Sequence, residues 1–310
     1  DSPVVRALLE ARRRGKQVTA VVELKARFDE EQNINWAEEL ERAGVNVVYG
    51  FAGLKIHAKL CLVVRREPKG MRRYAHIGTG NYNASSAKIY TDLGLFTARD
   101  DICSDVQDLF NVMTGFGVID NYRRIFVSPN HLRANITRLI REEAEIHRAK
   151  GGGRIIMKCN QLVDQGIVRE LYEASRAGVK IECVVRGICS LRPGIKNVSE
   201  TISVHSIVGE LLEHARIYYF EHGGEPVMYV GSADMMTRNL NGRIEVLTPV
   251  LDKKLMDNIL KQIVNPQLAD NTHAWELLSD GSYKKIKREA GAVAMDSQSH
   301  IKRVLNLLKR

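Results

Sequence analysis

Two histidines open the same short motif in different halves of this 310-residue chain. His57 stands two residues before Lys59, and His214 stands two residues before Arg216. A neutral imidazole can attack an electrophile or pass a proton. Phosphoryl transfer depends mainly on positioning and on neutralising negative charge, which a nearby cation supplies. The two motifs therefore predict phosphoryl-transfer chemistry, with the two imidazoles sharing the work across a common cavity.

Glycine loops and two further arginines extend this candidate site. The loops 78–81, which end at Asn81, and 231–234 carry glycine and small polar residues, so their backbone N–H groups could approach an anion. Arg186 ends an expected buried strand, and Arg27 stands similarly in the first half. Arginines at the carboxyl ends of strands commonly face the ligand crevice of an open α/β sheet. The alternative for Arg186 is a buried ion pair.

The chain also predicts an internal repeat. Positions 10–23 resemble positions 173–186, and each reads as a helix that ends at a glycine and leads into a β-branched strand. The copies are offset by 163 residues there, by 157 at the histidines and by 153 at the glycine loops. We therefore expect a duplicated α/β unit. The first domain would cover 1–124, with its N-terminal part truncated, and the second would cover 125–310.

Periodicity and turn residues predict the individual elements. Strands are expected at 45–49, 60–64, 74–77, 125–127, 155–158, 217–220 and 227–230, and helices at 34–43, 85–90, 102–114, 132–150, 166–177, 253–264 and 300–309.

Composition narrows the class of protein. The formal net charge of +9 suits an anionic partner, and 44% hydrophobic residues allow a proper core. Five cysteines without a Cys-x-x-Cys pattern indicate reduced thiols and a cytoplasmic location. No apolar stretch reaches the roughly 18 residues of a membrane span, so membrane contact would be peripheral. The chain has neither a P-loop nor a His-Glu-x-x-His zinc motif.

The repeated His-x-Lys or His-x-Arg motif with its glycine loop resembles the phospholipase D superfamily. This resemblance implies two tandem phospholipase D-like α/β domains. The superfamily pattern continues to an aspartate a few residues beyond the lysine. This chain has Val64 there in the first copy and Glu221 near the matching place in the second.

A closer resemblance is to polyphosphate kinase of the phosphohistidine type. The matching segments are 22–31, 53–59, 74–83, 90–92, 185–191, 212–216 and 232–239, so the resemblance covers nearly the whole chain. It corresponds to the two C-terminal catalytic domains of that family.

The resemblance to polyphosphate kinase implies an activity and a set of site residues. The reaction would be reversible transfer of the γ-phosphoryl group of ATP to inorganic polyphosphate, with magnesium. His57 would become phosphohistidine, and His214 would be the second essential histidine. Tyr90, Arg186, Lys59, Asn81 and Arg216 would contact ATP or phosphate. Arg27 matches a position associated with the magnesium site. Because a guanidinium has no lone pair for a metal, Arg27 would hold the phosphates that carry the metal.

The same resemblance implies partners. The family enzyme has an N-terminal domain and a helical domain before these two, and its full-length form would be a homo-oligomer without a specific nucleic acid partner. Two other functions stay open at this point: a phospholipase D-like phosphodiesterase, and a non-catalytic module that binds polyphosphate and DNA alike.

Overall fold

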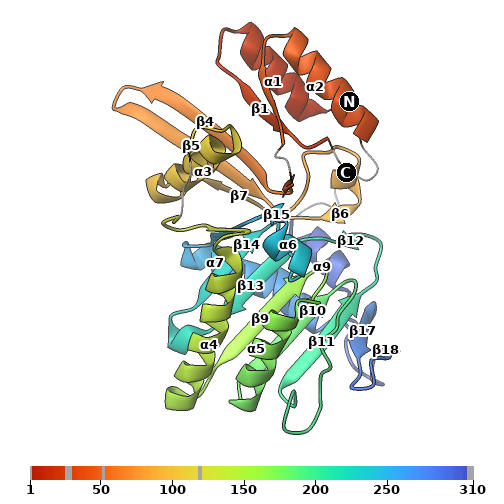
Figure 1. Ribbon diagram of the computed structural model, residues 1–310. Helices are drawn as coiled ribbons and strands as arrows, with labels where there is room; N and C mark the ends of the chain where they lie inside the picture. Colours follow the sequence, from red (N-terminus) through yellow and green to blue (C-terminus); the bar gives the residue numbers. More distant parts are fainter. Residues whose placement is uncertain (1, 25–29, 51–52, 118–120, 306–310) are drawn as a thin grey trace.

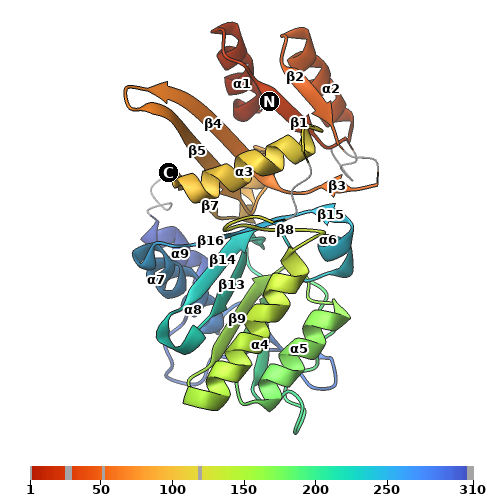
Figure 2. The same ribbon diagram turned by 60° about the vertical axis from the view of Figure 1, so that its left-hand side comes forward.

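The computed structural model describes residues 2–24, 30–50, 53–117 and 121–305. It confirms the expected mixed α/β fold, with the first half of the chain lying over one end of the second (Figures 1 and 2). Arg27 lies outside the described residues.

The second half is built on a nine-stranded sheet with the order β18-β17-β11-β10-β9-β13-β14-β16-β8. Strands β9, β10 and β11 run parallel to one another, and the other neighbours pair antiparallel. The strands are β8 (Phe126–Val127), β9 (Arg154–Cys159), β10 (Lys180–Val185), β11 (Ile202–Ile207), β13 (Arg216–Phe220), β14 (Val227–Gly231), β16 (Val246–Pro249), β17 (Ala274–Leu277) and β18 (Tyr283–Lys285).

Helices cover both faces of this sheet, which explains its continuous apolar strands. Ile155 and Met157 of β9 pack into the cluster formed with α4 (Leu132–Lys150) and α5 (Gln165–Arg176). Ile156, between them, faces the opposite cluster. That side holds α7 (Lys253–Ile259), the π-helical turn η3 (Leu260–Val264), α8 (Asn265–Leu268) and α9 (Ser297–Val304).

The first half forms two smaller layers. Helices α1 (Pro3–Arg13) and α2 (Glu30–Arg42) accompany the parallel pair β1 (Thr19–Val22) and β2 (Asn46–Tyr49). The antiparallel strands β4 (Lys59–Glu67), β5 (Gly70–Gly78) and β7 (Gly94–Thr97) carry α3 (Asp100–Met113) on one face.

Two short parallel pairings join the halves. In one, β3 (Lys55–Ile56) pairs with β15 (Arg243–Ile244); in the other, β6 (Tyr90–Thr91) pairs with β12 (Leu212–Glu213). Three short helical turns complete the described elements: η1 (Ser86–Lys88), η2 (His222–Gly224) and α6 (Thr237–Asn241).

The internal repeat is confirmed at the level of strand register. Lys59 lies opposite Gly78 in the β4–β5 pair, and Arg216 lies opposite Gly231 in the β13–β14 pair. The helix ends that precede β1 and β10 also match, because Gly15 and Gly178 both adopt positive φ. One difference concerns β9, which pairs with both β10 and β13. In the described first half no strand joins β1 to β4 in this way.

Most expected elements are present, and one expectation was wrong. The helix expected at 85–90 is only the three-residue turn η1, and Tyr90 lies instead in β6, because β12 of the other half supplies a strand partner. The segment 253–264 is helical as expected, but it changes to π geometry after Ile259. The helix expected at 300–309 is present as α9 up to Val304, and residues 306–309 lie outside the described residues. All five cysteines are unpaired, as expected, and three are buried. Among the described helices, none has the length and apolar character needed to span a membrane.

Candidate active site

His57 pairs with a carboxylate from the other half of the chain. It follows β3, and its Nδ1 lies 2.8 Å from Oε2 of Glu245, whose side chain is fully buried. Asn239 donates from Nδ2 to the other carboxylate oxygen at 2.5 Å. A carboxylate only accepts, so Nδ1 of His57 carries the proton and Nε2 keeps its lone pair. An imidazole in this state can act as a nucleophile through Nε2.

His214 makes the reciprocal contact. Its Nδ1 lies 2.8 Å from Oδ1 of Asp92, which belongs to the first half. Thr79 also donates to this carboxylate oxygen, at 2.6 Å. The ring of Tyr90 lies against the imidazole, with ring centroids 4.7 Å apart. His214 is therefore held in one orientation by groups from the first half.

The two carboxylates are repeat equivalents that the halves exchange. Asp92 follows Gly78, and Glu245 follows Gly231, by the same 14 residues. Each acid orients the histidine of the other copy, which makes the site depend on both halves. Sequence reasoning assigned no role to either acid, because it sought an acid close behind the cation. The offset of 153 residues that aligns the glycine loops also aligns these acids, and it was the signal that could have found them.

Two buried cations lie beside the histidines. Lys59 donates from Nζ to the backbone oxygen of His57. Nη1 of Arg216 donates to the backbone oxygens of His214 at 2.6 Å and Thr79 at 3.2 Å, and lies 3.2 Å from both ring nitrogens of His214. Asp234 balances Arg216 at 3.1 Å. Arg216 thus joins the two halves at the site.

These surroundings keep both imidazoles neutral. Burial lowers the pKa of His57 to about 4, outweighing the opposite effect of Glu245, and Lys59 lowers it further. Burial also lowers the pKa of His214, with Arg216 acting in the same direction. The pKa of Lys59 falls to about 7, again mainly through burial. A site with desolvated cations and neutral imidazoles is prepared to receive a polyanion.

Arg186 reaches the same network through one intermediate. Its Nε donates to Oδ1 of Asn160 at 3.2 Å, and the backbone N–H of Asn160 donates to Asp234 at 2.7 Å. No ion pair with a carboxylate involves the Arg186 guanidinium in the part of the chain that is described. The buried ion pair weighed as its alternative role is therefore not found there.

The first glycine loop has a packing role as well. A Cβ added to Gly80 would lie 2.1 Å from Oδ2 of Asp92, so only glycine admits this carboxylate. Asn81, next in sequence, is exposed, and its side chain forms no hydrogen bond among the described residues. The structure therefore brings His57, Lys59, His214 and Arg216 together with Tyr90, but shows no contact for Asn81.

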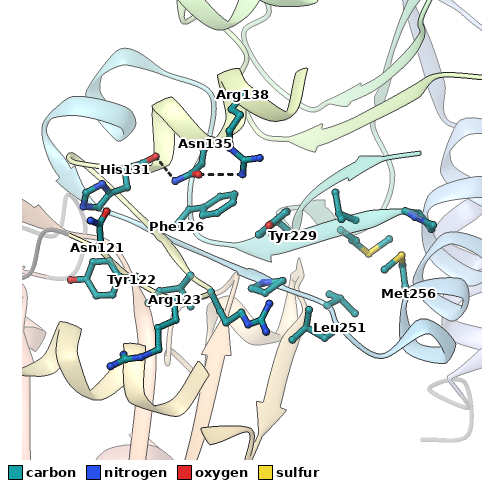
Figure 3. A pocket seen from close by; sticks show the side chains of 17 residues that line it. Asn121, Tyr122, Arg123, Phe126, His131, Asn135, Arg138, Tyr229, Leu251 and Met256 are labelled. Atoms are coloured by element: carbon teal, nitrogen blue, oxygen red, sulfur yellow. Dashed lines mark hydrogen bonds between the residues drawn. The ribbon is translucent and has the colours of Figure 1, made fainter. Parts of the chain in front are cut away.

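A separate hollow of about 440 Å³ lies where the segment 121–126 meets α4, β14 and α7 (Figure 3). None of the site residues expected from the sequence lines it. Three arginines do, but each is already paired with a carboxylate: Arg123 with Asp108 at 2.9 Å, Arg124 with Asp101 at 2.9 Å and Arg138 with Glu142 at 2.8 Å.

Comparisons with known proteins agree with this geometry. The class defined by fold and site is a two-part α/β protein with a duplicated histidine and cation motif. The family model for polyphosphate kinase C-terminal domain 1 matches residues 1–121, and that for C-terminal domain 2 matches residues 125–298. The chain belongs to the polyphosphate kinase family.

Individual relatives show the same likeness. A polyphosphate kinase 1 from Chlorobaculum tepidum is 52% identical over 94% of this chain and 42% of its own length. A polyphosphate kinase from Synechocystis sp. is 52% identical over 96% of this chain and 41% of its own length. The crystal structure of polyphosphate kinase from Porphyromonas gingivalis matches 99% of this chain and 47% of that chain, with 37% identity and a TM-score of 0.91. The chain thus spans less than half the length of these relatives.

Proposed function

We propose that this chain is the catalytic region of a polyphosphate kinase, which transfers the γ-phosphoryl group of ATP reversibly to inorganic polyphosphate through a phosphohistidine at His57. The observation that carries the proposal is the reciprocal pairing of His57 with Glu245 and of His214 with Asp92 around two buried cations. Family membership and the names of the relatives support the same activity.

The reaction steps follow from the protonation state of His57. Its unprotonated Nε2 attacks the γ-phosphorus, a P–N bond forms, and the bond to the β,γ-bridging oxygen breaks as ADP leaves. Nδ1 keeps its proton, so Glu245 stabilises the positive charge that the ring acquires. In the second step a terminal oxygen of polyphosphate attacks the phosphorus and the P–N bond breaks.

The remaining residues bind the phosphates and neutralise their negative charge. Lys59 and Arg216 offset charge on the transferred group, and Arg186 contacts the nucleotide phosphates. Tyr90, already against His214, offers an aromatic surface to ATP. His214 acts as the second histidine. Because its Nδ1 is bonded to Asp92, Nε2 must first take up a proton before it donates to the leaving oxygen or to the transferred group. Asn81 and Arg27 complete the proposed phosphate contacts.

No group of three or more His, Cys, Asp or Glu side chains that could hold a metal ion is present in the described ranges. Asp92 and Glu245 are already engaged by the histidines. Magnesium would therefore accompany the nucleotide as its phosphate complex. Arg27 would hold those phosphates.

We also propose a division into a first domain, 1–124, and a second domain, 125–310, working with an N-terminal and a helical domain in a homo-oligomeric cytoplasmic enzyme. The length of the relatives supports the additional domains. The unpaired thiols support a reducing compartment.

The test is to incubate the full-length protein with γ-labelled ATP. We expect a protein-bound phosphate that is stable in alkali and labile in acid, and that is lost in His57→Ala. His131→Ala, away from the site, should label normally. Label on serine or aspartate would refute the mechanism. Cleavage of a phosphodiester without dependence on nucleotide would favour the phosphodiesterase alternative instead.

A further inference from the structure

A buried carboxylate beside His214 has no place in the mechanism above. Glu213 is 2% exposed. Its oxygens accept four hydrogen bonds from four different elements: from Lys158 at 2.7 Å, Gln267 at 2.7 Å, Gln298 at 2.8 Å and Thr91 at 3.0 Å. Burial raises the pKa of Glu213, but Lys158 and the other donors outweigh burial and bring it below the usual value. Glu213 is therefore an ionised centre that collects donors from β9, α8, α9 and β6.

Thr91 connects this centre to the catalytic histidine. Its hydroxyl donates to Glu213, because an ionised carboxylate cannot donate. The same oxygen accepts from the backbone N–H of His214 at 3.3 Å. The neighbours of Thr91 in sequence are Tyr90 and Asp92, the two residues that contact the His214 ring. The placement of Thr91 thus determines both ring contacts.

Helix α9 holds the other side of the same segment. Gln298 accepts from the backbone N–H of Leu211 at 2.9 Å and donates to its backbone oxygen at 2.8 Å. A Cβ on Gly209 would lie 2.4 Å from Oε1 of Gln298, so the segment passes very close to the helix. The helix itself is fixed where Ser297 donates to the buried Asp270 at 2.7 Å and 2.9 Å.

We propose that Glu213 is a positioning residue for His214, acting through Thr91, and that helix α9 maintains it through Gln298. None of the three contacts substrate in the proposed mechanism. They fix the β6–β12 pairing, on which the orientation of the His214 imidazole between Asp92 and Tyr90 depends. The inference rests on the proposed function only in assigning His214 a part in catalysis.

The first test is a matched pair in the full-length protein. Thr91→Val removes the hydroxyl and keeps the shape, whereas Thr91→Ser keeps the hydroxyl. We expect Thr91→Val to lower kcat about 10-fold or more, as losses of outer contacts to catalytic groups do. Thr91→Ser should restore most of kcat. Equal rates in Thr91→Val and the wild type, or equal losses in the two variants, would overturn the proposal.

The second test concerns the helix. Gln298→Met should lower kcat in the same manner, whereas Arg303→Met, at an exposed position of the same helix, should not. The double variant Thr91→Val with Gln298→Met should lose less than the product of the single losses, because both act on one contact path. Strictly multiplicative losses would refute the shared path.

Failure of the inference is distinguishable from failure of the proposed function. If the wild type transfers phosphate and His214→Ala does not, but Thr91→Val is normal, only the positioning role fails. If the wild type forms no phosphohistidine, the proposed function fails instead.

Discussion

At the scale of single residues, the site depends on carboxylates that face imidazoles rather than substrate. Glu245 receives one donor from His57 and one from Asn239. A carboxylate satisfies both donors, but an amide has a single acceptor oxygen. This difference makes Glu245 a direct probe of how His57 is oriented.

We expect Glu245→Gln to slow phosphorylation of His57 by about 100-fold or more, in the range found when the partner of a catalytic histidine is neutralised. The amide must turn its NH₂ group toward either His57 or Asn239, so one contact is lost. The measurement is single-turnover labelling with γ-labelled ATP, with the exposed Glu200→Gln as control. A labelling rate equal to that of the wild type would show that Glu245 does not orient His57.

The low pKa of His57 also predicts how stability varies with pH. The folded state holds this pKa at about 4, whereas an unfolded histidine titrates near its usual 6.5. As pH falls from 6.5 toward 4, the unfolded chain takes up a proton that the folded protein refuses, so this group lowers stability over that window. Below pH 4 both states are protonated and the loss stops growing.

Between pH 7 and pH 5 the His57 contribution amounts to about 2 kcal/mol by this linkage. We therefore expect the free energy of unfolding to fall by about 2 kcal/mol less in His57→Gln than in the wild type when the pH is lowered from 7 to 5. Urea denaturation at the two pH values measures it. Parallel losses in the two proteins would mean that His57 titrates normally in the folded state.

At the scale of elements, the sequence predicted the repeat and most of the longer helices. It predicted several of the strands that bury apolar residues, but not β11, β16 or β17. It located His57, Lys59, His214 and Arg216, because each motif is contiguous. It did not predict β3, β6, β12 and β15, which are two residues long and exist only through pairing between the halves. For the same reason Tyr90 was expected in a helix. Short strands stabilised by a distant partner leave no periodic pattern in a single sequence.

The glycine loop gives a prediction at this scale. Gly80→Ala would place a methyl group against Asp92 and push its carboxylate away from His214. We expect phosphate transfer to fall about 10-fold or more, as in other losses of outer contacts to a catalytic group. Gly117→Ala, where a Cβ would meet nothing within 4 Å, is the matched control. If Gly80→Ala kept full activity, Asp92 could not be the group that orients His214.

At the scale of the whole molecule, the two halves differ in how they form their hydrophobic cores. The second half closes a large core around its nine-stranded sheet from its own residues. The core beneath β4 and β5 is different, because it combines first-half residues such as Ile77 and Ile102 with Ile125, Ile244 and Val246 of the second half. The two histidine–carboxylate pairs repeat this dependence, since each histidine is hydrogen-bonded to an acid of the other half.

This asymmetry predicts the behaviour of the separated halves. A fragment of residues 125–310 should unfold cooperatively, because its principal core is intact. A fragment of residues 1–124 should show no cooperative transition, because Ile125, Ile244 and Val246 leave its central cluster when the chain is cut, and removing buried aliphatic side chains costs about 2 to 5 kcal/mol each against a total stability of about 5 to 15 kcal/mol. Thermal unfolding followed by circular dichroism distinguishes the two cases. A cooperative transition in 1–124 alone would show that the first half carries its own core, and that the exchange of acids, rather than shared packing, is what binds the halves into one catalytic unit.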